Sequence, residues 1–151
     1  MRRKLVVGNW KMHGSRPANA ELLAGVAGAR PYGGDVAVCV PFPYLSETAV
    51  TLAGTDLRWG AQDCSAHEQG AFTGEVAGSM IRDLGATWVI LGHSERRQIY
   101  GETDAIVAKK TAVAMASGPR PIVCVGETLA EREAGATIEV TPAQADDLRA
   151  I

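Results

Sequence analysis

The sequence predicts an α/β protein whose strands form a parallel β-sheet. Three observations indicate this class. Short runs rich in β-branched residues recur along the 151-residue chain. Stretches rich in alanine and leucine separate these runs, which gives five βα units of roughly 20–35 residues each. Four of the five runs are apolar almost throughout, as is typical of parallel strands covered on both faces.

The elements follow one another in a regular order. The expected strands are 4–8, 35–40, 57–61, 87–92 and 121–126. The third is the weakest, because Arg58 breaks its apolar run. Helical stretches are expected at 18–29, 43–54, 76–85 and 104–118. Three of these stretches end at a glycine, which readily adopts the left-handed conformation common at the C-terminal end of a helix. The glycines are Gly54, Gly85 and Gly118. Nothing marks a domain boundary, so we expect one domain over 1–151.

The composition and charge of the chain limit the class of protein and the kinds of partner to be expected. Hydrophobic residues make up 46% and charged residues 21%, which is typical of a soluble globular protein. The net charge of −2 gives no support for a nucleic-acid or membrane partner. The basic start is followed by too short an apolar run for a signal peptide, and no segment approaches the ~20 residues that span a bilayer. Three cysteines without C-x-x-C spacing favour reduced thiols. We therefore expect a cytoplasmic protein.

Polar residues follow the first, fourth and fifth expected strands. Because the carboxyl ends of parallel strands meet at one edge of a sheet, these residues are expected to share one polar pocket. They are Asn9, Lys11, His93, Ser94, Glu95, Cys124 and Glu127. The histidines and cysteines lack metal-ligand spacing, and no phosphate-binding or dinucleotide motif follows a strand. We therefore expect no metal and no cofactor.

His93 has the clearest chemical use in this set. It ends an apolar strand and opens a helix, whose partial positive charge disfavours a second positive charge on the imidazole. We expect a neutral histidine that donates a hydrogen bond to a developing oxyanion. The histidine could equally be structural, and His13 and His67 are expected in loops or on the surface.

The other residues also fit structural roles. Lys11 fits a solvated loop lysine, and Asn9 fits a turn. Ser94 fits the N-cap of the following helix, with Glu95 complementing the helix dipole. Cys124 fits a small buried hydrophobe better than a nucleophile. Surface or ion-pair positions are expected for Arg96 and Arg97.

Two architectures accommodate five βα units. A flavodoxin-like open sheet needs five strands and about this length. A (β/α)8 barrel needs eight strands and ~250 residues. Strand count alone favours the open sheet. The irregular stretch 62–75 is long for a loop in a compact domain, and such loops are usually functional or interfacial.

Five motifs, taken in order, decide between these architectures. They are "GNWKMHG", "AQDCSAHEQGAFTGE", "VILGHSERR", "IYGETD" and "PIVCVGETLAEREAG". From Leu5 to about Val140 the chain resembles the triosephosphate isomerase family. The resemblance implies a TIM barrel, here an incomplete one with strands one to five and without strands six to eight. It also implies interconversion of dihydroxyacetone phosphate and glyceraldehyde 3-phosphate through an enediolate, in glycolysis and gluconeogenesis.

The resemblance assigns a role to each matched residue. His93 stands at the position of the electrophile, a neutral histidine that works with a glutamate base in this family. Lys11 stands where a lysine neutralises the anionic substrate and enediolate, and Asn9 where the substrate oxygen is held. Glu95 matches the acid that pairs with the lysine. Ser94 matches a serine that bonds the base.

Three further positions follow from the resemblance. Cys124 and Glu127 fall beside the site as supporting residues. The loop 62–75 resembles the dimer loop, with Thr73 reaching into the partner's site. The resemblance therefore implies a homodimer in the full-length protein.

The family's general base has no counterpart in these residues. It lies on the sixth strand, and neither Glu95 nor Glu127 matches it. The segment 141–151 also departs from the family pattern, and Pro142 falls where a helix should continue. We expect little activity from this chain alone, with strands one and five as unpaired edges. The alternative is a non-catalytic α/β module that binds phosphorylated anions weakly or associates with another chain.

Overall fold

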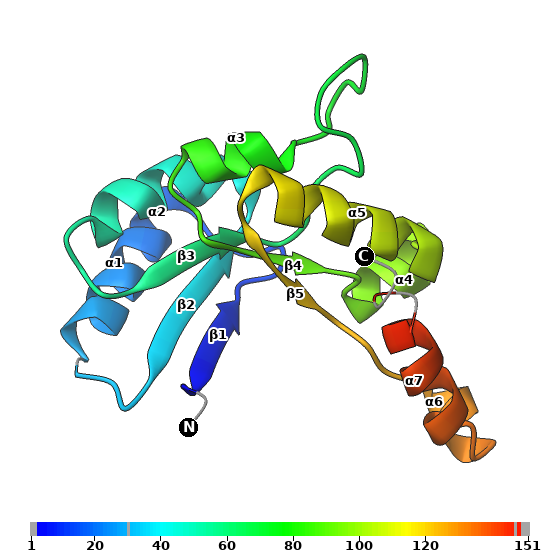
Figure 1. Ribbon diagram of the computed structural model, residues 1–151. Coiled ribbons are helices and arrows are strands. Elements are labelled where there is room, and N and C mark those ends of the chain that lie inside the picture. Colours follow the sequence, from blue (N-terminus) through cyan, green and yellow to red (C-terminus); the bar gives the residue numbers. More distant parts are fainter. Residues whose placement is uncertain (1–2, 30, 147, 149–151) are drawn as a thin grey trace.

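A computed structural model describes residues 3–29, 31–146 and 148 (Figure 1). The basic start and the segment 141–151 therefore lie partly outside the described residues. The strands are β1 Leu5–Asn9, β2 Asp35–Val40, β3 Arg58–Ala61, β4 Trp88–Leu91 and β5 Arg120–Val123. All neighbours pair in parallel, as expected.

The order of the strands in the sheet is β1-β2-β3-β4-β5. A flavodoxin-like sheet would place the first strand between the second and the third. The open sheet that strand count favoured is therefore wrong, and the sequential order with the curl visible in Figure 1 is that of a partial (β/α) barrel. Strands β1 and β5 form its two edges, as expected.

The four helical stretches expected from the sequence are present; the first begins two residues earlier than expected, and the other three are shorter. The helices of the structure are α1 Arg16–Gly28, α2 Leu45–Leu52, α3 Gly78–Asp83, α4 Ser94–Tyr100, α5 Asp104–Ser117, α6 Leu129–Glu133 and α7 Thr137–Asp146, with a 3-10 turn η1 Phe42–Tyr44 before α2. Thr103 is the N-cap of helix α5, and its hydroxyl accepts a hydrogen bond from the Ile106 N–H. Contrary to the expected break, α7 continues through Pro142 at the cost of one backbone hydrogen bond.

The hydrophobic core lies between the central strands and the helices on the convex face of the sheet. Leu23 of α1, Leu52 of α2, Ile81 of α3 and Val107 of α5 pack there and are almost fully buried. Strand β1 is different, since Val6 is 63% exposed. The expectation that the apolar strands are covered on both faces is therefore wrong for this edge, where helices cover only the convex side (Figure 1).

Candidate active site

The carboxyl ends of β1 and β4 bring four of the expected site residues into one pocket of about 290 Å³. These residues are Asn9, Lys11, His93 and Glu95. Their meeting follows from the parallel sheet, because both strands run towards this end. The chain after β3 contributes Asp63 to the same wall.

The remaining residues do not share this pocket. Ser94, Cys124 and Glu127 line an adjoining pocket of about 380 Å³, and His93 borders both. The expectation of one common pocket is therefore wrong: the residues that follow β1 line one pocket, those that follow β5 line the other, and His93 lies between them. Thr73 is exposed in the loop 62–75 and lines neither pocket.

Lys11 occupies an unusual backbone conformation. Its φ is 52°, in the left-handed region that side chains other than glycine rarely adopt. The Asn9 side chain holds this turn, because its Oδ1 accepts from the Lys11 N–H at 2.9 Å. The Lys11 Nζ then lies 2.8 Å from Glu95 Oε1. Asn9 thus fixes the turn from which the lysine reaches the start of α4.

His93 is the N-cap of α4, a position that was expected for Ser94. Ser94 is instead the first residue inside the helix. The cap position has a chemical consequence for the ring, because His93 Nδ1 accepts a hydrogen bond from the Glu95 backbone N–H at 3.3 Å. An accepting Nδ1 carries no proton, so the proton of the neutral ring lies on Nε2. The Glu95 carboxylate, 3.4 Å from Nδ1, receives no hydrogen bond from it.

Gly92 lies directly before His93 and sets the backbone direction from β4 into α4. Its φ is 64°, and a Cβ built on it would lie 2.8 Å from Val107 Cγ1. Arg97 holds the same point from α4, since its Nε donates to the Gly92 carbonyl at 2.7 Å and its Nη2 to the Cys124 carbonyl at 3.3 Å. The arginine also pairs with Asp104. It therefore ties the ends of β4 and β5 together.

The pKa shifts of the site residues indicate which of them are charged at neutral pH and which are not. The hydrogen bond from Lys11 lowers the pKa of Glu95, so this carboxylate is charged at neutral pH. Burial raises the pKa of Cys124, which keeps it a thiol and supports the structural alternative over a nucleophile. Burial also raises the pKa of Cys39 and Cys64 to about 12. Glu127 is held by Arg132 at 2.7 Å in the second pocket.

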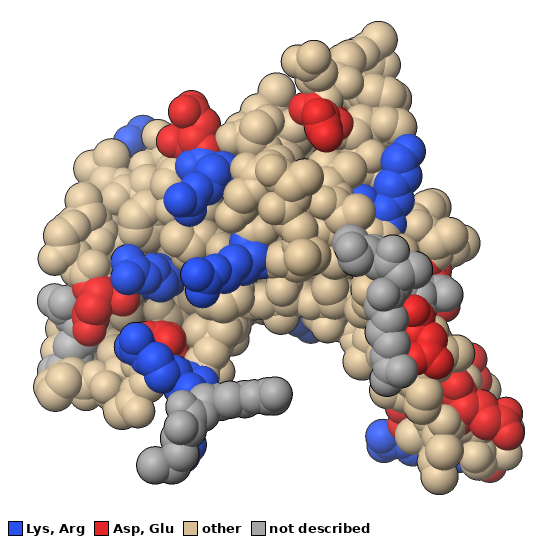
Figure 2. Space-filling model, in the orientation of Figure 1, with Lys and Arg blue, Asp and Glu red and all other residues tan. Residues whose placement is uncertain are grey.

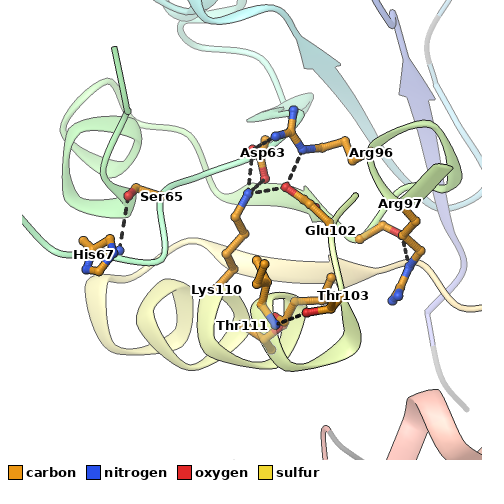
Figure 3. Close-up of polar contacts among 12 residues, drawn as sticks. Asp63, Ser65, His67, Arg96, Arg97, Glu102, Thr103, Lys110 and Thr111 are labelled. Atoms are coloured by element: carbon orange, nitrogen blue, oxygen red, sulfur yellow. Dashed lines mark hydrogen bonds and ion pairs between the residues drawn. The ribbon is translucent and has the colours of Figure 1, made fainter. Parts of the chain in front are cut away.

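A group of four charged side chains, two of which line the pocket, was not singled out by the sequence pattern. This buried charge cluster consists of Asp63, Arg96, Glu102 and Lys110 (Figure 3). Lys110 Nζ lies 2.8 Å from Asp63 Oδ1 and 2.5 Å from Glu102 Oε1. Arg96 bonds the same two carboxylates, at 3.0 and 2.7 Å. Arg96 thus forms ion pairs, as one of its expected roles allowed.

These features define a class of protein. A parallel sheet in sequential order, curled as a partial barrel, carries its polar pocket at the carboxyl ends of the strands, where barrel enzymes place their sites. The sequence model of one family, "TIM: Triosephosphate isomerase", matches residues 4–150. The chain belongs to the triosephosphate isomerase family, as the resemblance indicated.

Curated relatives support the same assignment. The triosephosphate isomerase of Thiobacillus denitrificans is 58% identical over 146 residues, which are 97% of this chain and 58% of the relative. That of Cupriavidus taiwanensis is 57% identical over 145 residues, or 95% of this chain and 59% of the relative. That of Bordetella pertussis is 50% identical over 151 residues, or 99% and 61%. The chain thus spans about three fifths of the length of these relatives.

The described residues contain neither a candidate membrane span nor a candidate metal site. None of their helices combines the length and apolar character needed to cross a membrane. Within the same residues, no group of three or more histidine, cysteine or acidic side chains is arranged to hold a metal ion.

Proposed function

We propose that this chain carries part of the active site of a triosephosphate isomerase, the part that binds and polarises the substrate. The observation that carries the proposal is the His93 cap. With Nδ1 used as an acceptor, Nε2–H is the donor that the ring offers to a substrate oxygen. Lys11 borders the same pocket with its ammonium group. A neutral donor beside a fixed cation suits an enediolate oxygen.

The proposed reaction moves a proton between the two carbons of a triose phosphate. His93 polarises the carbonyl and passes a proton between the substrate oxygens, as in the family mechanism. Lys11 offsets the charge of the phosphate and the enediolate, and Asn9 holds a substrate oxygen. Glu95 serves as the counterion of Lys11 before substrate binds.

The proposal assigns the general base to no carboxylate described above. Glu95 is paired with Lys11, and Glu127 is paired with Arg132 in the second pocket. Ser94, which would bond the base, borders that second pocket as well. We therefore expect the isolated 151 residues to turn over substrate poorly.

The association and location of the protein also remain proposals. The loop 62–75, with Thr73, is proposed to form a homodimer contact in a full-length protein. The two sheet edges favour the alternative of a non-catalytic module that associates with another chain. Three free cysteines support a cytoplasmic location.

A chimera tests the catalytic proposal. Residues of this chain replace the aligned part of the Thiobacillus denitrificans relative, and turnover is measured with a coupled assay. We expect an active chimera that loses at least about a hundredfold in kcat when His93→Gln removes the catalytic imidazole. His13→Gln is the matched control, since His13 is exposed and does not line the pocket.

Three outcomes separate the alternatives. A folded chimera without activity supports the non-catalytic module. An active chimera whose turnover is unchanged by His93→Gln contradicts the electrophile assignment. Turnover by the isolated chain near that of the chimera contradicts the placement of the base outside the described residues.

A further inference from the structure

The opposite end of the sheet carries an unassigned cavity of about 510 Å³ lined by four arginines. Three of them stand where strands begin: Arg3 precedes β1, Arg58 opens β3 and Arg120 opens β5. The fourth is Arg82 from the end of α3. We call this cavity the arginine cleft. Figure 2 shows lysine and arginine side chains gathered over this side of the molecule, where the strands start in Figure 1.

The charges in the arginine cleft are not balanced. Its one lining carboxylate is Asp35, which pairs with Arg3 at 2.5 Å. Within the described part of the chain, no ion pair involves Arg58, Arg82 or Arg120. Arginine stays protonated at all physiological pH values. A chain with a net charge of −2 thus gathers, in one cavity, three arginines that form no ion pair with another described residue.

Two of these arginines are held by their surroundings. Gly118 has a φ of 113°, and a Cβ there would lie 3.2 Å from Arg82 Cγ, so the arginine stem rests against the glycine. The Arg120 guanidinium lies over the Trp88 ring, 5.8 Å from its centroid. Strand pairing sets Trp88 beside Arg120. Side chains already held in place lose less entropy when they bind a ligand.

We propose that the arginine cleft binds a small anion with several linked phosphates, such as a polyphosphate chain or the triphosphate of a nucleotide. Guanidinium groups bind phosphate oxygens in pairs of parallel hydrogen bonds, and three groups that form no ion pair with another described residue match three linked phosphates. The cavity is too small for a folded partner. The cleft lies at the end of the sheet opposite to the His93 pocket, so the proposal does not rest on the isomerase assignment.

Calorimetric titration of the 151-residue chain with sodium tripolyphosphate, in low salt with EDTA, tests the proposal. We expect one bound tripolyphosphate per chain. Arg58→Gln and Arg120→Gln should each weaken binding about tenfold, because each removes a charged hydrogen-bond donor. Arg120→Lys should weaken binding less, since it keeps the charge. Circular dichroism checks that each variant remains folded.

Two controls locate the site. Arg16→Gln alters an exposed arginine that pairs with Glu47, outside the cleft, and should change the affinity less than about twofold. Lys11→Gln should also leave tripolyphosphate binding in place. Binding that is lost in Lys11→Gln and retained in the cleft variants would overturn the proposal and assign the anion to the other pocket.

Two further ligands identify the chemistry. ATP that binds as tightly as tripolyphosphate indicates recognition of the phosphate chain alone, and tighter ATP binding indicates a nucleotide; both support the proposal. Citrate should bind at least about tenfold more weakly, because its carboxylates are not linked as phosphates are. Equal binding of citrate, or no binding of tripolyphosphate, overturns the proposal.

Discussion

Two groups of charged side chains lie at the same end of the sheet and differ in their exposure to water. In the buried charge cluster, the side chains of Lys110 and Glu102 are 7% and 6% exposed. The pair formed by Lys11 and Glu95 in the pocket is 51% and 44% exposed. Both groups join a lysine to a glutamate at hydrogen-bond distance.

The difference in exposure determines how much each group contributes to stability and how easily its ion pairs can be rearranged. A buried charge without its partner costs several kcal/mol, so breaking this cluster should lower the stability of the fold. An exposed ion pair contributes little to stability and can be rearranged at little cost. The exposed pair is therefore suited to an exchange in which Lys11 leaves Glu95 for an anionic ligand, while the buried charge cluster holds the scaffold beneath it.

The largest expected effect comes from Lys110→Met. It removes one of the two cations that the carboxylates of Asp63 and Glu102 share and leaves Arg96 as the other, and should lower the free energy of unfolding by about 3–5 kcal/mol. Urea unfolding followed by circular dichroism measures the loss. Lys109→Met, on the exposed face of the same helix, is the matched control and should change stability by less than about 0.5 kcal/mol. Equal losses in the two variants would remove the distinction between the two groups.

A smaller loss is expected from Glu102→Gln. The Glu102 Oε2 is buried with no partner among the described residues, so an amide nitrogen there would be an unsatisfied donor. The change should cost about 1–3 kcal/mol at pH 7. The same urea titration measures it.

The pH dependence of that loss checks its electrostatic origin. Burial acts to raise the pKa of Glu102, but the bonds and charges of Lys110 and Arg96 outweigh burial and lower it. A lowered pKa means that the carboxylate stabilises the fold above the ordinary glutamate pKa of about 4.3, and that this stabilisation is lost as pH falls through the lower folded value. Burial raises the pKa of Asp63, which is a shift in the opposite direction. Asp63 is present in both the wild type and Glu102→Gln, so its titration does not account for the difference between them. The difference between wild type and Glu102→Gln should shrink below about pH 4, and a constant difference would argue against ionisation as its cause.

The smallest effect is expected at the exposed pair. Glu95→Gln should leave the urea midpoint within the scatter of repeat measurements, because the lost partner is replaced by water. The pair should instead be visible in titration. Carbon-13 NMR of the Glu95 carboxyl should give a pKa below the ordinary glutamate value, and Lys11→Gln should return it to the ordinary range. A large loss of stability in Glu95→Gln would place this pair with the buried charge cluster.

The sequence predicted the elements better than their arrangement. Every expected strand and helix is present, because periodicity and glycine positions are local signals. The order of the strands in the sheet is not a local property. The five strand sequences resemble one another, and nothing in their pattern of apolar residues specifies which strands pair. Only the motifs indicated the barrel order. Arg58, which looked like a break in a strand, is its first residue and lines the arginine cleft.

The candidate site was predictable to the same extent. Asn9, Lys11, His93 and Glu95 could be grouped because topology brings strand ends together. The buried charge cluster could not, because Lys110 beside Lys109 has the pattern of an ordinary surface lysine. Its burial depends on packing against residues 47 positions away along the chain. The split of the site into two pockets likewise depends on packing that the sequence pattern does not show.

The sequential order of the strands has a consequence for how the protein is made. Each strand pairs with the next one along the chain, so every addition to the sheet closes a single βα loop. A chain leaves the ribosome from its N-terminus at about 5–20 residues per second. When β2 emerges from the ribosome, its pairing partner β1 has therefore already been synthesised. In the same way, β2 is already available when β3 emerges. The sheet can grow in the direction of translation, with the most recent strand always forming the edge to which the following strand is added.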